Sequence, residues 1–239
     1  MFFYVNKQAA QQHMLAMLVT LRGDIFQLQR IAIGNRISAI ERGVDETSPA
    51  ALAIMRRWYE RFAKLEEEAT NDIEDISDGI RIIDRMIKVK GVGRTLASKV
   101  VSKVDISKAR TVSALWRYAG YAVVNGQRER LVRGERSHFN RQLKTYCYQV
   151  ATSMMRTGSP YRRVYEDARA GYEAAHPDWT KAHTHNASLR KMIKIWLAHL
   201  YLEWRELEGL PARAPYVVDH VPGHTDNYKA ADFGWHDED

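Results

Sequence analysis

The chain of 239 residues lacks several features that define common protein classes. It has one cysteine, Cys147, so it can form neither an intramolecular disulfide nor a metal site built on several thiolates. No apolar run approaches the roughly 18 residues of a membrane-spanning helix. The N-terminal segment 1–7 also lacks the basic-then-apolar layout of a signal peptide. We therefore expect a cytoplasmic protein without membrane attachment.

Signals for catalysis and for bound metals are sparse as well. There is no phosphate-binding loop of the Gly-x-x-x-x-Gly-Lys-Ser/Thr type. Nuclease chemistry that depends on a metal needs two or more converging carboxylates, and Asp105 alone does not supply them. His220 and His224 are four residues apart, but Pro222 and Gly223 between them argue against a helix that would align the two rings. We predict no metal and no cofactor.

What the sequence does contain is a strongly basic middle section. Between residues 88 and 163 there are 17 Lys and Arg residues against three acids, a local net charge of +14. The flanking segments 45–87 and 215–239 each have a net charge of −5. A basic block of this kind is typical of proteins that bind a polyanion, and nucleic acid is the most common one.

The N-terminal third predicts two long helices. Apolar residues recur at three- and four-residue steps within 6–42, and Ser48-Pro49 is a typical start for the second helix. A heptad seam then runs from Met55 to Ile87. The seam could pair with residues 6–42 as a helical hairpin, with another copy of the chain, or with both. The positions that we expect to contact a protein partner or a second copy are Met55, Phe62, Leu65, Ile76 and Ile83.

The segment from residue 87 to 100 is the most informative motif. Gly91 and Gly93 flank one apolar residue, and a helix rich in small residues follows. This pattern resembles the helix-hairpin-helix DNA-binding motif, in which a glycine turn lets backbone N–H groups approach a phosphate at a helix N-terminus. The alternative is an ordinary tight turn. We expect phosphate contacts from Lys88, Lys90, Gly91, Gly93, Arg94, Thr95 and Lys99.

The remaining elements are predicted to be mostly helical. Further helices are expected over 111–120, 139–156, 160–172 and 186–208. Asn125-Gly126 is a turn signal within the basic segment 121–136, which allows one short β-hairpin. The fold class is therefore all-α, with N-terminal helices and a coiled-coil stalk over 1–87, a helix-hairpin-helix domain over 88–210 and an extended acidic tail over 211–239.

The order of these features over residues 85–208 resembles the C-terminal domain of one recombinase family. The segments that carry the resemblance are Val89-Lys90-Gly91-Val92-Gly93, Leu115-Trp116-Arg117-Tyr118-Ala119-Gly120-Tyr121, Asn140-Arg141-Gln142-Leu143-Lys144 and Leu189-Arg190-Lys191-Met192-Ile193. The family is that of the Piv/MooV-type enzymes, which include the bridge-RNA-guided insertion-sequence transposases. The resemblance implies a DNA-binding helical domain.

Two departures from that family bear on catalysis. The chain has no counterpart of the family's RuvC-like acidic domain, and the expected nucleophilic serine position falls near Asn125. An amide cannot form the covalent phosphodiester link that a hydroxyl oxygen can form. Ser137 is the nearest serine, and we consider it only a weak candidate for a displaced nucleophile.

We therefore expect a non-catalytic DNA-binding protein associated with the nucleoid, an accessory factor in recombination or replication of a phage or mobile element. A second stretch of DNA backbone would be held by Arg128, Arg130, Arg133, Arg136 and Arg141. One alternative is a compact serine recombinase or nuclease. Another is a coiled-coil adaptor that recruits a recombinase to DNA.

Overall fold

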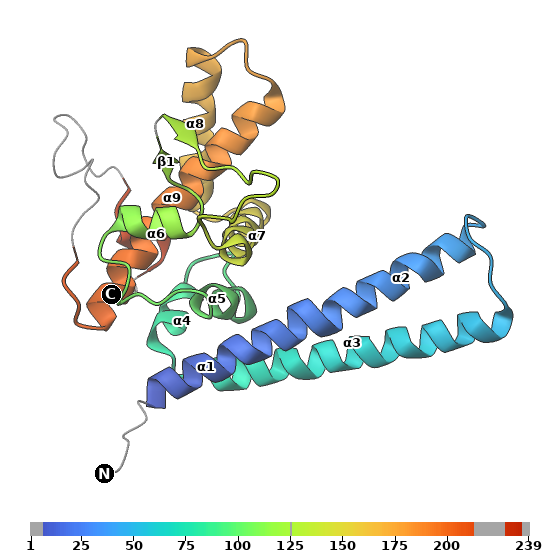
Figure 1. Ribbon diagram of the computed structural model, residues 1–239. Coiled ribbons are helices and arrows are strands. Elements are labelled where there is room, and N and C mark those ends of the chain that lie inside the picture. The colour runs from blue at the N-terminus through green and yellow to red at the C-terminus, as the bar shows by residue number, and fades with distance from the viewer. Residues whose placement is uncertain (1–6, 125, 213–227, 236–239) are drawn as a thin grey trace. The chain divides into compact units, whose positions relative to one another are not determined.

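The computed structural model describes residues 7–124, 126–212 and 228–235, and it confirms the all-α fold class (Figure 1). The chain divides into two compact units, residues 1–78 and 79–239. The division lies at 78/79 rather than at 87/88, where the sequence placed it. Among the described helices, none combines the length and the hydropathy of a membrane span.

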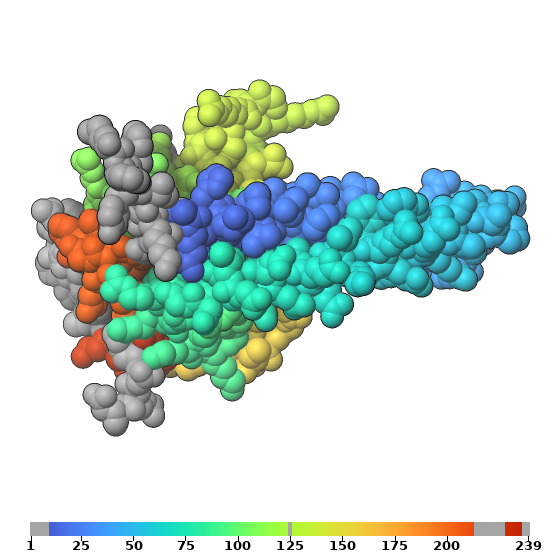
Figure 2. Space-filling model, turned by 90° about the horizontal axis from the view of Figure 1, so that it is seen from below, coloured from blue at the N-terminus to red at the C-terminus, as the bar shows by residue number. Residues whose placement is uncertain are grey.

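The first unit is a helical hairpin within the chain. One arm consists of α1 (Lys7–Thr20), the π-helical segment η1 (Leu21–Gln27) and α2 (Leu28–Glu41). The other arm is α3 (Pro49–Ser77), and both views show the two arms side by side (Figures 1 and 2). Ser48 begins α3 as expected, because its hydroxyl oxygen accepts a hydrogen bond from the Ala51 N–H at 3.2 Å.

The single helix expected along the whole heptad seam is wrong, because α3 ends at Ser77. Gly79 has a φ of +73°, a left-handed conformation that no right-handed helix contains, and α4 (Arg81–Met86) begins only after it. Ile83 therefore belongs to the second unit, where it is fully buried. That burial excludes it from the expected partner surface, whereas Met55, Phe62 and Leu65 do lie on α3 and are partly or largely exposed.

A buried carboxylate ties the two arms of the hairpin together. Glu66 on α3 accepts a hydrogen bond from Gln27 at 2.7 Å and forms ion pairs with Arg22 at 3.2 Å and Arg30 at 2.7 Å. The π-helical segment explains this convergence. Its hydrogen bonds join residues five apart, so Arg22 and Gln27 face the same side and reach the same carboxylate oxygen.

We predict that Glu66→Ala destabilises the hairpin by about 3 kcal/mol, because it leaves two partly buried guanidinium groups without their carboxylate. The measurement is the free energy of unfolding from urea titration of the full chain. Glu68→Ala is the matched control, since Glu68 is exposed and forms a surface ion pair with Lys64, four residues earlier. Equal losses for the two variants would contradict this account.

The second unit is organised around α9 (Lys181–Leu207). This helix contacts α4, α6 (Val112–Tyr118), α7 (Arg141–Thr157) and α8 (Tyr161–Ala175). A further helix, α5 (Arg94–Val101), packs on α4 and α7. The predicted helices are confirmed, although α9 begins earlier than expected because the Thr180 hydroxyl caps it by accepting a hydrogen bond from the His183 N–H at 3.2 Å.

A β-hairpin is present as predicted, but Leu131-Val132, the segment expected to form its second strand, lies in an irregular loop. Strand β1 (Val123–Val124) pairs antiparallel with β2 (Gln127–Arg128) across Gly126, which has a φ of +74°. The second strand, β2, directly follows the turn, and the residues after β2 form an irregular loop. Asn125 itself lies outside the described residues.

The extended tail expected over 211–239 is wrong for residues 228–235, which pack into the second unit. Phe233 and Trp235 are fully buried, and the Trp235 indole N–H donates to the Tyr161 hydroxyl at 2.7 Å. His199 on α9 hydrogen-bonds to the Tyr228 carbonyl at 2.6 Å. Burial of two large apolar side chains, together with these hydrogen bonds, holds the segment against α8 and α9. The other expected tail residues, 213–227 and 236–239, lie outside the described residues.

Candidate nucleic-acid interface

The glycine motif forms the loop between α4 and α5, in the helix–loop–helix order that the sequence predicted. Val89 and Val92 are buried beneath the loop, and the Val92 N–H donates to the Val89 carbonyl at 2.9 Å. Lys88 and Lys90 alternate with these valines and are exposed. The apolar residues of this segment therefore face the core, and the basic residues face the solvent.

The two glycines have different physical roles. Gly91 has a φ of +94°, and a Cβ there would lie 2.5 Å from the Thr157 hydroxyl and 2.9 Å from the Met154 Cα. Its lack of a side chain therefore serves packing against α7. Gly93 has an ordinary φ of −81° and no atom within 4 Å of a Cβ built on it. Only Gly93 leaves open space beside the first N–H groups of α5.

The basic residues predicted around this loop do not all reach its surface. Lys99 is only 9% exposed, and its ammonium group lies 3.4 Å from the Gln149 amide oxygen on α7. Its burial contradicts a place among the surface phosphate ligands. Arg94 is partly buried and forms an ion pair with Asp84 at 3.1 Å, while Thr95 lies half-buried in the first turn of α5.

The second predicted cluster extends from the last residue of β2 through the irregular loop after it to the start of α7. The side chains of Arg128, Arg130, Arg133, Arg136 and Arg141 are all exposed. Ser137 lies in the same loop, where its hydroxyl donates to the Phe139 carbonyl at 2.7 Å and accepts from the Phe139 N–H at 3.3 Å. Both hydrogen bonds stabilise the turn in which Ser137 lies. The helix cap that follows is Asn140, whose side-chain oxygen accepts from the Leu143 N–H at 3.0 Å.

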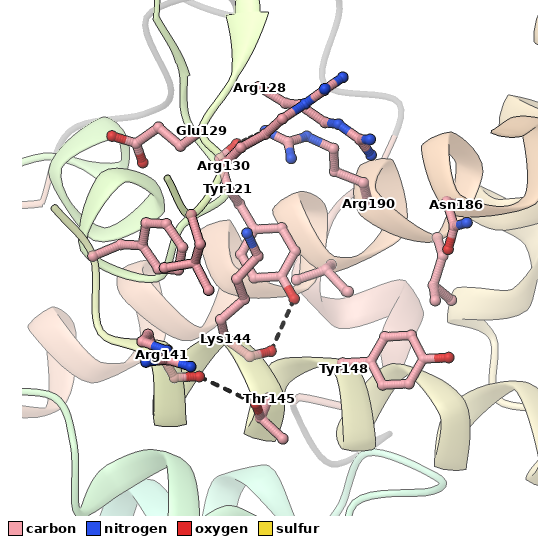
Figure 3. A pocket seen from close by; sticks show the side chains of 14 residues that line it. Tyr121, Arg128, Glu129, Arg130, Arg141, Lys144, Thr145, Tyr148, Asn186 and Arg190 are labelled. Atoms are coloured by element: carbon pink, nitrogen blue, oxygen red, sulfur yellow. Dashed lines mark hydrogen bonds between the residues drawn. The ribbon is translucent and has the colours of Figure 1, made fainter. Parts of the chain in front are cut away.

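Three members of this cluster line a cavity of about 630 Å³, shown in Figure 3. Two further cations complete the lining, Lys144 from α7 and Arg190 from α9. In Figure 3, the guanidinium groups of Arg128, Arg130 and Arg190 gather at one end, while the Glu129 carboxylate points away from them. The full lining is Tyr121, Arg128, Glu129, Arg130, Leu131, Phe139, Arg141, Lys144, Thr145, Tyr148, Asn186, Leu189, Arg190 and Ile193.

Five cationic side chains line this cavity. Burial lowers the pKa of Lys144, and repulsion from Arg190 lowers it further. The pKa of Arg190 is lowered too, mainly by burial, although the nearby Tyr121 opposes the shift. In the described part of the chain, no carboxylate forms an ion pair with any cation of the lining. Five cations against one carboxylate, Glu129, give the lining a net positive charge that suits it to an anion.

Arg190 also fixes the walls of the cavity. One of its terminal nitrogens donates to the carbonyl oxygens of Tyr121 and Ala122, both at 2.8 Å, and so joins α9 to the chain before β1. Tyr121 is 5% exposed, and its hydroxyl donates to the Lys144 carbonyl at 3.1 Å. These bonds hold α7, α9 and the hairpin around one space.

Sequence reasoning did not identify Arg190 or Tyr148 as site residues. A signal for Arg190 exists, because Arg190 and Lys194 are four residues apart on α9 and lie among buried apolar neighbours. Lys194 uses its position differently, since its ammonium group lies 4.0 Å from the centre of the Trp116 ring. Tyr148 gives no comparable signal, because tyrosine is found both in cores and on surfaces.

The glycine loop and the cavity are separated along α7. Lys144 lines the cavity near the start of this helix, and Met154 contacts the Gly91 loop near its end. Ten residues at a rise of 1.5 Å place the two features about 15 Å apart. The structure therefore keeps the two predicted basic clusters as separate surfaces of one unit.

No protein-family model matches the chain, and neither a curated protein nor a solved structure matches it. The geometry of the two basic surfaces is therefore the basis on which function can be assigned.

Replacing each glycine by alanine should distinguish the packing role of Gly91 from the open surface position of Gly93. We predict that Gly91→Ala lowers the free energy of unfolding by about 2–3 kcal/mol, because alanine is strained at positive φ and meets the α7 backbone. Gly93→Ala should change it by less than about 1 kcal/mol. Urea titration of both variants tests this difference, and an equal effect would contradict the packing role of Gly91.

The lowered pKa of Lys144 predicts that the stability of the protein depends on pH. The folded protein releases the Lys144 proton at lower pH than the unfolded chain does, so the unfolded state binds more protons and stability rises with pH. The window runs from the lowered pKa of Lys144 to the ordinary lysine value of about 10.4. Lys144→Met should remove this part of the rise in urea midpoint, whereas Lys108→Met, at an exposed site, should keep it. A wild-type profile in Lys144→Met would contradict the prediction.

Proposed function

We propose that the protein binds DNA without acting on it chemically, as an accessory factor in recombination or replication of a phage or mobile element. The observation that carries the proposal is the set of five cationic side chains around one cavity, none of them ion-paired within the described part of the chain. The resemblance of residues 85–208 to the C-terminal domain of Piv/MooV-type enzymes belongs to the same proposal. Its setting would be the bacterial cytoplasm, at the nucleoid.

The glycine loop supplies a second contact in this proposal. Lys88 and Lys90 are exposed there, and the open space at Gly93 leaves room for a phosphate beside the start of α5. Two anchor points about 15 Å apart on a rigid helix suit a backbone whose phosphates repeat at regular intervals. Such contacts position DNA and carry no base preference.

The hydrogen bonds of Ser137 support a role without covalent chemistry. Its hydroxyl is engaged by the backbone of its own turn at 2.7 and 3.3 Å. A nucleophilic serine instead requires a general base within hydrogen-bond reach of its oxygen.

A recruiting role is a second candidate, favoured by the first unit. Helix α2 buries none of its residues, and Leu28, Ile31 and Trp58 are 57%, 46% and 44% exposed. Helices usually bury an apolar stripe, and exposed apolar surface often marks a protein contact. The DNA-binding and recruiting roles are compatible.

The test of DNA binding is fluorescence anisotropy with a labelled duplex over a range of salt concentrations. Four phosphate contacts predict a loss of affinity of roughly a hundredfold between about 50 and 200 mM salt. The double variant Arg128→Gln/Arg130→Gln should bind more weakly and reduce the salt slope by about 2.

The matched control is Arg162→Gln, which also removes an exposed arginine from the second unit. Arg162 lies on α8 and pairs with Glu166 at 2.8 Å, away from the cavity lining. It should leave affinity and slope near those of the wild type. An affinity that barely changes with salt would overturn the proposal.

A further inference from the structure

We propose that the cavity between α7, α9 and the β-hairpin holds one unpaired nucleotide of a DNA strand, with its phosphate on the arginine cluster and its base against Tyr148. This inference rests on the proposed DNA binding and specifies which form of DNA the cavity selects. It assigns the protein to ends, gaps or branched regions of DNA, where unpaired nucleotides occur.

The shape of the cavity separates unpaired from paired nucleotides. Its volume of about 630 Å³ lies in the range of pockets that enclose a small organic ligand. The phosphates of a duplex lie on a convex surface, and its bases are stacked inside, so neither a paired base nor its sugar can enter a concave site. An unpaired nucleotide can be turned outward and placed in such a pocket.

The two ends of the cavity match the two parts of a nucleotide. Arg128, Arg130 and Arg190 gather at one end, and guanidinium groups match phosphate oxygens in geometry as well as charge (Figure 3). Figure 3 shows Lys144 beside Tyr121, and its ammonium group lies 4.3 Å from the centre of the Phe139 ring. Burial lowers the pKa of Lys144 and of Arg190, repulsion between neighbouring cations adds to both shifts, and the Glu129 carboxylate opposes them.

Tyr148 lies on the other side of the cavity, where its side chain is available to a ligand. It is 49% exposed, and the lining beside it includes the apolar side chains of Leu189 and Ile193. Stacking on an aromatic ring tolerates all four bases, because each has a π-face. The cavity therefore recognises an unpaired state and not a sequence.

The experiment compares a labelled oligodeoxythymidine with a blunt duplex of equal length at one ionic strength. Wild type should bind the single strand more tightly. Tyr148→Ala should weaken single-strand binding by about tenfold or more and leave duplex binding unchanged. Tyr148→Phe keeps the ring and should retain wild-type affinity. Thermal melting of each variant verifies that the fold is intact.

Two further measurements identify the ligand and control for the loss of a positive charge. Arg130→Gln should weaken single-strand binding more than Arg117→Gln, since Arg117 belongs to the basic block but does not line the cavity. Deoxythymidine monophosphate should compete only weakly with the oligonucleotide. Competition at equal concentration would instead identify a free-nucleotide site and overturn the inference.

The failure of this inference is distinguishable from failure of DNA binding itself. If the duplex binds with the expected salt slope but Tyr148→Ala affects both DNA forms equally, the cavity is an ordinary backbone contact and the inference is overturned. If wild type binds neither form at about 50 mM salt, the proposed function fails first.

Discussion

The second unit depends on the packing of α9 against four other helices. Along its 27 residues, α9 buries side chains such as Trp196, Leu197 and Leu200 against α4, α6, α7 and α8. Because one long helix passes through the whole unit, the positions of the shorter helices are fixed relative to it and to one another. The C-terminal segment 228–235 is held by the same helix, through the hydrogen bond between His199 and the Tyr228 carbonyl. The order of the unit thus derives from a single apolar surface.

The same helix creates the electrostatic character of the candidate site. Arg190 emerges from the apolar surface of α9, so its charge is half-buried, and its two hydrogen bonds to the chain before β1 prevent it from turning to solvent. Lys144 on α7 is then brought beside it, and the pKa of each is lowered mainly by burial. The lining holds five cations and one carboxylate, Glu129, so repulsion between the cations is only partly offset. An anion in the cavity would reduce this repulsion, which is the electrostatic basis of the proposed binding.

The first unit has a different balance of forces. A two-helix hairpin buries little apolar surface, and α2 buries no residue completely. Its polar cluster around Glu66 therefore specifies the register of the two arms, and the π-helical segment aligns Arg22 and Gln27 with that carboxylate. The exposed apolar side chains that remain on α2 and α3 are available to a protein partner. This exposed apolar surface is the basis of the recruiting role proposed for the first unit.

The sequence by itself determined the helical class, the two long N-terminal helices, the cap at Ser48 and the glycine loop, because these follow from local periodicity and turn chemistry. It left open whether the N-terminal helices pair with each other or with a second copy, and it did not identify Asn140 as the cap of α7. It could not show that α3 ends at Ser77, since the apolar heptads continue across Gly79 into a different core. Only the tertiary structure decided that Lys99 is buried, that Phe233 and Trp235 order the C-terminal segment, and that Arg190 joins the arginine cluster. These outcomes depend on contacts between residues far apart in the chain. No local pattern carries that information, because burial is a property of the assembled core.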